Sequence, residues 1–182
     1  MDFYLTRNPA DPDWLAQAAL FHGHLGPWLV LGAMIGRDAV ARLDTPGFWK
    51  IDVVCWLPAD RHRTPFSCIL DGLQTGCGAT AGKCNLRMEA SEEVLARGWP
   101  VVHVIRLPAA DRPAAGIAYA GTAALHDVLR RVTPENLEEI SRRLAADDVA
   151  RLFDIAPMSP LEMTLCGHGP DNQSPRRPVG GH

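Results

Sequence analysis

The stretch from residue 68 to residue 86 constrains this chain most, because it joins a predicted helix to a glycine-rich turn and concentrates reactive side chains. One face of that helix carries a thiol, an acid, an amide and a hydroxyl at offsets of three, six and seven residues: Cys68, Asp71, Gln74 and Thr75. The chain then turns at Gly76-Cys77-Gly78 and continues through Gly82-Lys83. Apolar packing does not require this mixture, so the segment indicates a site.

Length and charge limit the class of protein. A chain of 182 residues has the size of one domain with its own core. The net charge of −3 and the scattered basic residues argue against nucleic-acid binding. There is no signal-peptide pattern and no apolar run near the roughly 20 residues of a membrane span. We therefore expect a cytoplasmic protein with reduced thiols, in which clustered Cys and His indicate a metal site or catalysis.

The predicted elements are helices interspersed with a few strands. Helices are predicted over residues 12–21, 27–43, 68–75, 91–97, 117–132, 133–144 and 148–153, and strands over residues 48–57, 84–90 and 100–107. Because the strands are few and are not regularly separated by crossover helices, the fold class is α+β, a small mixed sheet with flanking helices.

The chain divides into residues 1–156, the folded domain, and residues 157–182, a tail rich in Pro, Gly, Ser and Arg that is expected to be poorly ordered. The tail contains three side chains that bind metals, Cys166, His168 and His182. A structural zinc site needs four ligands, so we do not expect a zinc finger there.

A second motif, His22-Gly23-His24, lies at the junction between the first two predicted helices. Imidazole is a common ligand for zinc, iron, copper and nickel, and the intervening glycine leaves the backbone room to turn. The alternative is a pair of half-exposed polar residues in a turn.

The cysteines differ in what their surroundings indicate. Cys68 and Asp71 lie one helical turn apart, so a thiolate and a carboxylate can meet the same ion or substrate. The nearby helix start predicts a lowered pKa for the Cys68 thiol, although a small buried residue is the alternative. Cys77 lies among glycines, where packing needs no thiol. Cys55 lies inside a predicted strand and is assigned to the core.

Residues 77–84 superficially resemble a phosphate-binding loop. That motif requires glycine at the position of Cys77 and Ser or Thr at the position of Cys84, between a strand and a helix. Neither residue fits, and the preceding element is a predicted helix, so binding of a nucleoside triphosphate is not expected. Lys83 and the free amides of the turn remain candidates to hold an anion.

Together the motifs resemble a known family. His22-Gly23-His24-Leu25-Gly26-Pro27, the block from Cys68 to Leu86 and the closing Leu152-Phe153 are similar to the characteristic segments of the FmdE family, which takes its name from formylmethanofuran dehydrogenase. The resemblance spans about residues 15–156. It implies an α+β core of family-specific topology, an intertwined homodimer and a polar site. It implies no particular reaction, because the FmdE component does not carry the tungsten or molybdenum cofactor of that enzyme.

The chain departs from the family pattern at three places. Gly26 stands where the family often has cysteine, which removes one possible ligand. Two extra residues separate Cys77 from Gly82-Lys83, and the tail lacks the C-terminal zinc finger of longer members.

Three hypotheses about function follow. In the first, a divalent transition metal, zinc before iron or nickel, binds His22, His24, Cys68 and Cys77. Asp71 or His22 then moves protons, and a one-carbon or pterin-like compound contacts the set Lys83, Gln74 and Thr75. In the second, a non-catalytic accessory or metal-handling protein uses the same ligands. In the third, Cys68 is a nucleophile and His24 its base.

Two structural expectations accompany these hypotheses. Gly32 and Gly36 lie on one face of the second helix, which permits the close approach of another backbone and is taken as support for the homodimer. The two motifs are expected to converge, with His24 and Cys68 in one ligand shell.

Overall fold

The computed structural model describes residues 8–96 and 98–168. Its α-helices are α1 (Asp13–His22), α2 (Pro27–Arg42), α3 (Ile69–Cys77), α4 (Glu92–Leu95), α5 (Ala123–Leu129), α6 (Leu137–Ala145), α7 (Val149–Leu152) and α8 (Pro160–Leu165). Its strands are β1 (Ile51–Trp56), β2 (Leu86–Glu89), β3 (Val101–Arg106), β4 (Ala115–Gly121) and β5 (Phe153–Pro157). Short 3-10 turns occur at Phe48–Lys50, Ala59–Arg61, Phe66–Cys68 and Ala81–Lys83.

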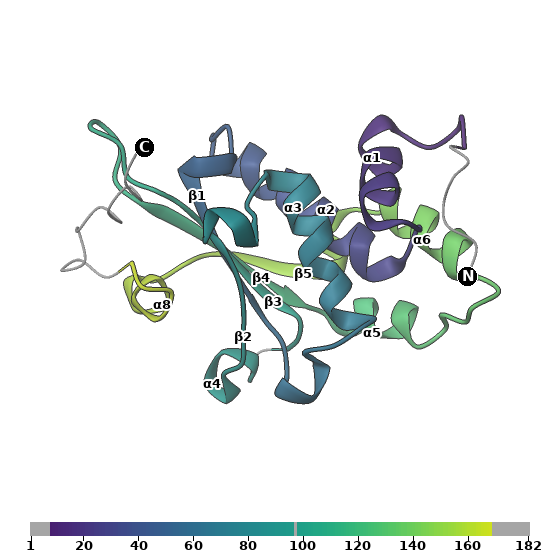
Figure 1. The fold of residues 1–182 in the computed structure, drawn as a ribbon. Coiled ribbons are helices and arrows are strands. Elements are labelled where there is room, and N and C mark those ends of the chain that lie inside the picture. Colours follow the sequence, from purple (N-terminus) through teal and green to yellow (C-terminus); the bar gives the residue numbers. More distant parts are fainter. Residues whose placement is uncertain (1–7, 97, 169–182) are drawn as a thin grey trace.

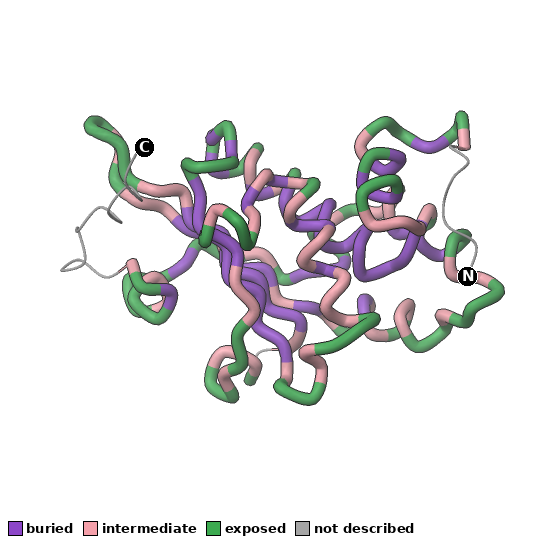
Figure 2. Tube along the Cα trace, viewed as in Figure 1, coloured by how far each residue is buried: buried purple, intermediate pink, exposed green. Residues whose placement is uncertain are grey.

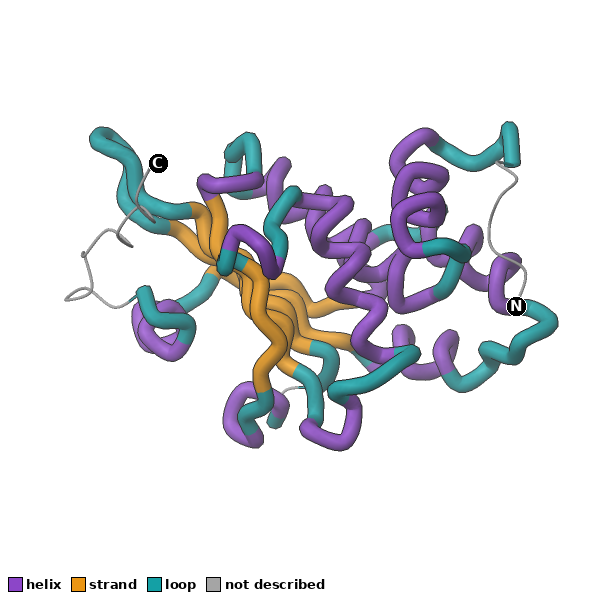
Figure 3. The backbone as a smooth tube through the Cα atoms, viewed as in Figure 1, coloured by secondary structure: helices purple, strands orange, loops and turns teal. Residues whose placement is uncertain are grey.

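Within these residues the strands form one five-stranded mixed sheet in the order β2-β1-β3-β4-β5. β1 and β2 are parallel and are connected through α3, whereas the other neighbours are antiparallel. Figure 1 shows α1, α2, α3, α5 and α6 on one side of the sheet and α4 and α8 on the other. The same two layers of helix around the strands are visible in Figure 3, and the α+β expectation is confirmed.

The sheet is buried because successive side chains of its central strands enter two different cores. On β1, Val53 and Cys55 pack with α2 and α3, whereas Val54 and Trp56 pack with residues of α4 and α8. All six residues of β1 are buried. Figure 2 shows this buried band running through the sheet into α2, with exposed chain at the loops.

Helices α2 and α3 make the closest helix contact in the fold, and glycine makes it possible. A Cβ atom at Gly32 would overlap the carbonyl oxygen of Ile69, and one at Gly72 would overlap that of Leu29. One turn further on, a Cβ atom at Gly76 would lie only 2.5 Å from the carbonyl oxygen of Ala33. The two backbones therefore touch, and side chains larger than hydrogen are excluded at the crossing.

This contact corrects one interpretation of the sequence. The face of α2 that carries Gly32 and Gly36 packs against α3 of the same chain, where a Cβ atom at Gly36 would lie 2.9 Å from the amide nitrogen of Cys77. The glycine face is therefore used inside the chain and gives no support to a dimer contact.

The helix predicted over residues 117–132 is wrong in its first half. Residues Ala115–Gly121 form β4, which pairs with β3 and β5, and only Ala123–Leu129 is helical. The alanine-rich composition suggested a helix, but Ile117 and Tyr119 alternate with small residues and bury their side chains against the main core. Thr122 then caps α5 through its side chain.

The first part of the predicted tail, residues 157–168, contains a helix. Residues 157–168 continue from β5 into α8, which Ser159 and Glu162 begin with a reciprocal capping box. Met158 and Cys166 on either side of α8 are buried in the second core. Arg87 donates to the carbonyl oxygen of Cys166, which fixes the end of α8. Residues 169–182, including His182, lie outside the described residues.

We predict that Gly72→Ala lowers the free energy of unfolding by at least about 2 kcal/mol, because the new methyl group overlaps the backbone of α2. Gly82→Ala is the matched control, since the nearest atom to a Cβ there is Thr80 Oγ1 at 3.9 Å. Its change should stay within about 0.5 kcal/mol. Urea denaturation of both variants measures the difference, and equal midpoints would contradict the glycine contact.

Candidate functional site

The histidine motif forms the junction between α1 and α2. His22 is the last residue of α1, and Gly23 ends that helix in the left-handed region with φ of 91°. Gly26 is extended and precedes Pro27, the first residue of α2. The short connection holds both imidazoles at the junction, with the His22 and His24 ring centroids 4.5 Å apart.

His22 links this junction to the second motif. Its Nδ1 lies 2.7 Å from Asp71 Oδ2. A carboxylate accepts hydrogen bonds, so Nδ1 carries the proton and Nε2 of the neutral ring carries a lone pair. That Nε2 atom is buried and has no hydrogen-bond partner among the described residues. A buried polar atom without a partner is costly, and this one therefore indicates a ligand.

Asp71 is itself held in place. Gln74 Nε2 donates to Asp71 Oδ1 at 3.1 Å, so both carboxylate oxygens are engaged. Thr75 lies one turn beyond Asp71 and donates to the carbonyl oxygens of Asp71 and Gly72. Of these two predicted contact residues, Gln74 orients the carboxylate and Thr75 supports the helix backbone.

His24 lies beside His22 and is half-buried. Burial lowers the pKa of His24, the neighbouring His22 lowers it further, and Glu138 on α6 partly opposes both. The ring is therefore neutral near pH 7, which is the form that binds metals. A Cβ atom at Gly26 would lie 3.2 Å from His24 Nε2, so a cysteine at this position would bring its side chain to the imidazole.

Cys68 immediately precedes α3 and is half-buried. The predicted lowering of its pKa is wrong. Burial raises the pKa of the Cys68 thiol, the Asp71 carboxylate raises it further, and only a backbone hydrogen bond opposes them. Charge and burial outweigh the helix start, because the carboxylate lies close enough to disfavour a thiolate.

Cys77 and Lys83 lie at the opposite end of α3. Cys77 follows Asp71 by six residues, about 9 Å along the helix axis and about 120° apart in direction. Its buried thiol donates to the carbonyl oxygen of Leu73, and burial raises its pKa to about 11. Lys83 Nζ donates to the carbonyl oxygen of Gly78, where α3 ends. The structure does not bring these two residues to the histidines.

The residues brought together are two imidazoles and a carboxylate that orients one of them. Among the described residues no group of three or more His, Cys, Asp and Glu side chains is arranged to hold an ion by itself. The donor set nevertheless fits a metal, because a ligating imidazole typically donates its other ring nitrogen to a carboxylate, as His22 does to Asp71.

A cavity of about 630 Å³ opens beside the histidine junction. Pro27 and Trp28, at the start of α2, are part of the lining, and so is Phe66, two residues before Cys68. Trp99, which lies shortly before β3, and Arg61 complete this part of the lining. These residues carry no recognisable signal in the sequence, because nothing in a local pattern indicates which distant aromatic side chains meet.

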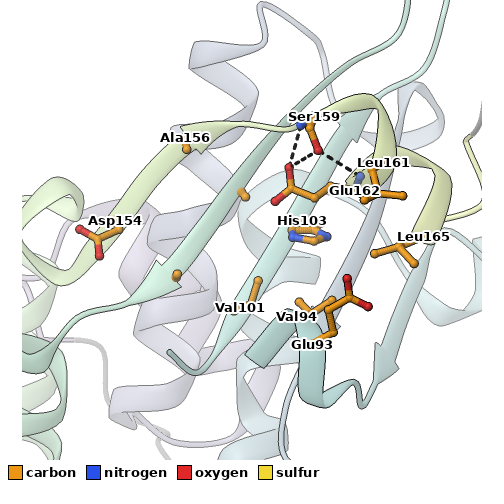
Figure 4. A pocket seen from close by; sticks show the side chains of 12 residues that line it. Glu93, Val94, Val101, His103, Asp154, Ala156, Ser159, Leu161, Glu162 and Leu165 are labelled. Carbon is orange, nitrogen blue, oxygen red and sulfur yellow. Dashed lines mark hydrogen bonds between the residues drawn. The ribbon is translucent and has the colours of Figure 1, made fainter. Parts of the chain in front are cut away.

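A second, smaller hollow of about 450 Å³ lies on the other face of the sheet. Figure 4 shows His103 between Val101 and the leucines of α8, with the Ser159–Glu162 capping box at the rim. Trp56 Nε1 donates to His103 Nδ1 at 3.1 Å, and Cys166 Sγ lies 3.3 Å from the same nitrogen. Because indole only donates, the ring proton of His103 is on Nε2. In the sequence, the signal for this hollow is His103, a histidine inside an otherwise apolar predicted strand.

Comparison with known proteins identifies the segment that carries both motifs. The protein-family model described as "FmdE, Molybdenum formylmethanofuran dehydrogenase operon" matches residues 21–105. Over this segment the chain is similar to the FmdE family. No curated protein matches the chain.

The FmdE segment begins at the end of α1 and reaches into β3. It therefore contains the histidine junction, the α2–α3 crossing, Asp71 and the turn fixed by Lys83. The family description names the operon of a molybdenum formylmethanofuran dehydrogenase. In the described ranges, no helix is both long and apolar enough to cross a bilayer.

We predict that the exposed Cys84 is the first thiol to be alkylated in the native protein. Burial raises the pKa of Cys55 and Cys166 to about 12 and that of Cys77 to about 11, so these thiols stay protonated at about pH 8. They should react with iodoacetamide more than about 100-fold more slowly. Peptide mass spectrometry measures the order, and equal rates should appear only in denaturant. Labelling of Cys55 as fast as Cys84 in the native state would contradict the buried core.

Proposed function

We propose that the protein is a cytoplasmic, metal-binding member of the FmdE family, with a divalent transition metal held at the junction of α1 and α2. His22 Nε2 and the imidazole of His24 are the proposed protein ligands, and Cys68 is the proposed third donor. Nitrogen and sulfur donors together favour zinc over magnesium or calcium, with iron and nickel as alternatives.

The unpartnered Nε2 of His22 is the observation that carries this proposal. It is buried, while Nδ1 of the same ring is fixed by Asp71 at 2.7 Å. The carboxylate sets both the tautomer and the direction of the ring, so the lone pair is prepared for a ligand before one arrives. Without a ligand, the buried nitrogen only destabilises the fold.

The roles of the other residues follow from their contacts. Asp71 accepts from both His22 and Gln74, so we assign it to positioning the imidazole. The raised pKa of Cys68 beside Asp71 keeps the thiol protonated in the absence of an ion. Binding of an ion to the sulfur would therefore release that proton. A bound zinc ion would supply a Lewis acid for a one-carbon or pterin-like compound.

The alternative, a non-catalytic accessory or metal-handling protein, uses the same residues. Zinc bound in a one-to-one ratio, with no turnover of formylated or pterin-type compounds, would favour the accessory function. Turnover that requires the ion would favour the enzyme.

A homodimer is part of the proposal. Leu20 and Phe21 are 72% and 58% exposed at the end of α1, directly before His22. A second copy covering these side chains would also approach the histidine junction and add donors to it. Sedimentation at micromolar concentration tests this, and a monomer would exclude a site shared between two copies.

We predict that His22→Ala abolishes stoichiometric zinc binding, because it removes the prepared lone pair. Asp71→Asn should weaken zinc affinity about 10- to 100-fold, since the imidazole loses its orienting carboxylate. Competition with a chelator on protein made without a His-tag measures both affinities, and mass spectrometry of metals gives the stoichiometry.

Two matched substitutions control for unspecific effects. His62 belongs to neither motif and bonds to the carbonyl oxygen of Leu57, so His62→Ala should leave zinc affinity unchanged. Cys68→Ser should lower the affinity and Cys84→Ser should not, because Cys84 lies beyond the far end of α3. Full zinc binding by His22→Ala would overturn the proposed site.

A further inference from the structure

Four aromatic rings, those of Trp28, Phe66, Trp99 and His126, form part of the lining of the cavity beside the histidine junction. Trp28 and Trp99 stack with centroids 5.9 Å apart and an angle of 13° between their planes. Phe66 meets both indoles edge-on, and His126 lies 4.9 Å from Trp99. A volume of about 630 Å³ is within the range of about 300–1,000 Å³ typical of small-molecule sites. Flat walls of this kind suit a flat ligand, because stacked rings gain most when their faces are covered.

Basic side chains supply the charge of this cavity. They are the guanidinium groups of Arg61 and Arg130, and among the described residues no carboxylate is part of the lining. Arg61 lies over the ring of Phe66 at 4.6 Å and over that of Trp99 at 5.4 Å, so its position at the rings is fixed. Each arginine has an exposed acidic partner, Asp60 for Arg61 and Asp127 for Arg130. Exposed pairs of this kind are weak, which leaves both guanidinium groups available to an anionic ligand.

The cavity also adjoins the proposed metal site. Leu137 lines the cavity, and the carboxylate of the next residue, Glu138, raises the pKa of His24. Trp28 lies four residues after His24, and Phe66 lies two residues before Cys68. Segments next to both motifs therefore contribute to the cavity wall.

We propose that this cavity binds a planar heteroaromatic anion, its ring system against Trp99 and Phe66 and its carboxylate or phosphate on Arg61. The proposal deepens the proposed function by naming a ligand class for the same site. It also stands without the metal, because none of the lining groups used here is a proposed metal ligand.

The test uses the full chain after removal of metal by a chelator, with binding measured by calorimetry. Pterin-6-carboxylate is the anionic probe, 6-methylpterin is its neutral counterpart and AMP is the phosphate counterpart. We expect pterin-6-carboxylate or AMP to bind at least about tenfold more tightly than 6-methylpterin, as a charge-assisted contact predicts. Tighter binding of AMP would identify the anion as phosphate, and tighter binding of pterin-6-carboxylate as carboxylate.

Arg61→Gln should weaken the preferred anion about tenfold while changing 6-methylpterin affinity by less than about twofold. Arg63→Gln is the matched control, because Arg63 is exposed, contacts the carbonyl oxygen of Asp60 and does not line the cavity. Trp99→Leu should weaken the anionic and neutral probes together, since both lose the stacking surface.

Three outcomes would overturn the proposal: equal affinity for anionic and neutral probes, no effect of Arg61→Gln, or no binding of any probe at about millimolar concentration. A Trp99→Leu protein that changes from dimer to monomer while keeping probe affinity would assign the cavity to a second copy instead. If the metal-free protein binds a probe but the protein never takes up zinc, the cavity proposal is supported and the metal site is rejected. Failure of the cavity proposal and failure of the proposed function can therefore be distinguished.

Discussion

The contact between the backbones of α2 and α3 is the constraint on which the rest of this structure depends. Gly32 and Gly72 each lie where a Cβ atom would overlap the carbonyl oxygen of the opposite helix. Asp71 directly precedes Gly72, and Pro27, at the start of α2, directly follows the histidine junction. A close crossing therefore carries the carboxylate to the imidazole, and wider spacing between the helices would separate the two motifs.

The pair of His22 and Asp71 shows that this crossing serves more than packing. An apolar pair would fill the same space without leaving a buried nitrogen unpartnered. The chain instead maintains an imidazole whose one nitrogen is fixed and whose other nitrogen is available. Such departures from the most stable arrangement concentrate at functional sites. The rings and guanidinium groups of the adjoining cavity continue this polar and aromatic surface outward from the junction.

The sequence was sufficient for the parts of the fold that depend on local signals. Pro27 and the glycines marked α2 to within one residue of its end, and the helix before Gly78 was also predicted. β4 was missed, because alanine favours a helix until tertiary pairing is known. Cys77 and Lys83 were grouped with the histidines because they are near Asp71 in sequence. Residues six apart on a helix differ in direction by about 120°, and only the neighbouring elements reveal which direction meets the junction.

The order of strands in the sheet has a consequence for synthesis of the chain. His22 and Asp71 are 49 residues apart, and β1 lies between them. Both residues precede residue 90, as do α2, α3 and the parallel pair of β1 and β2. β3, β4 and β5 are added later, and of these three strands β3 pairs with the other edge of β1. During translation, His22 and Asp71 are therefore both synthesised before β3 is available to pair with β1. At that stage β1 has an unpaired edge, which can associate with other chains. The half of the molecule that contains the site depends on the later half to protect it.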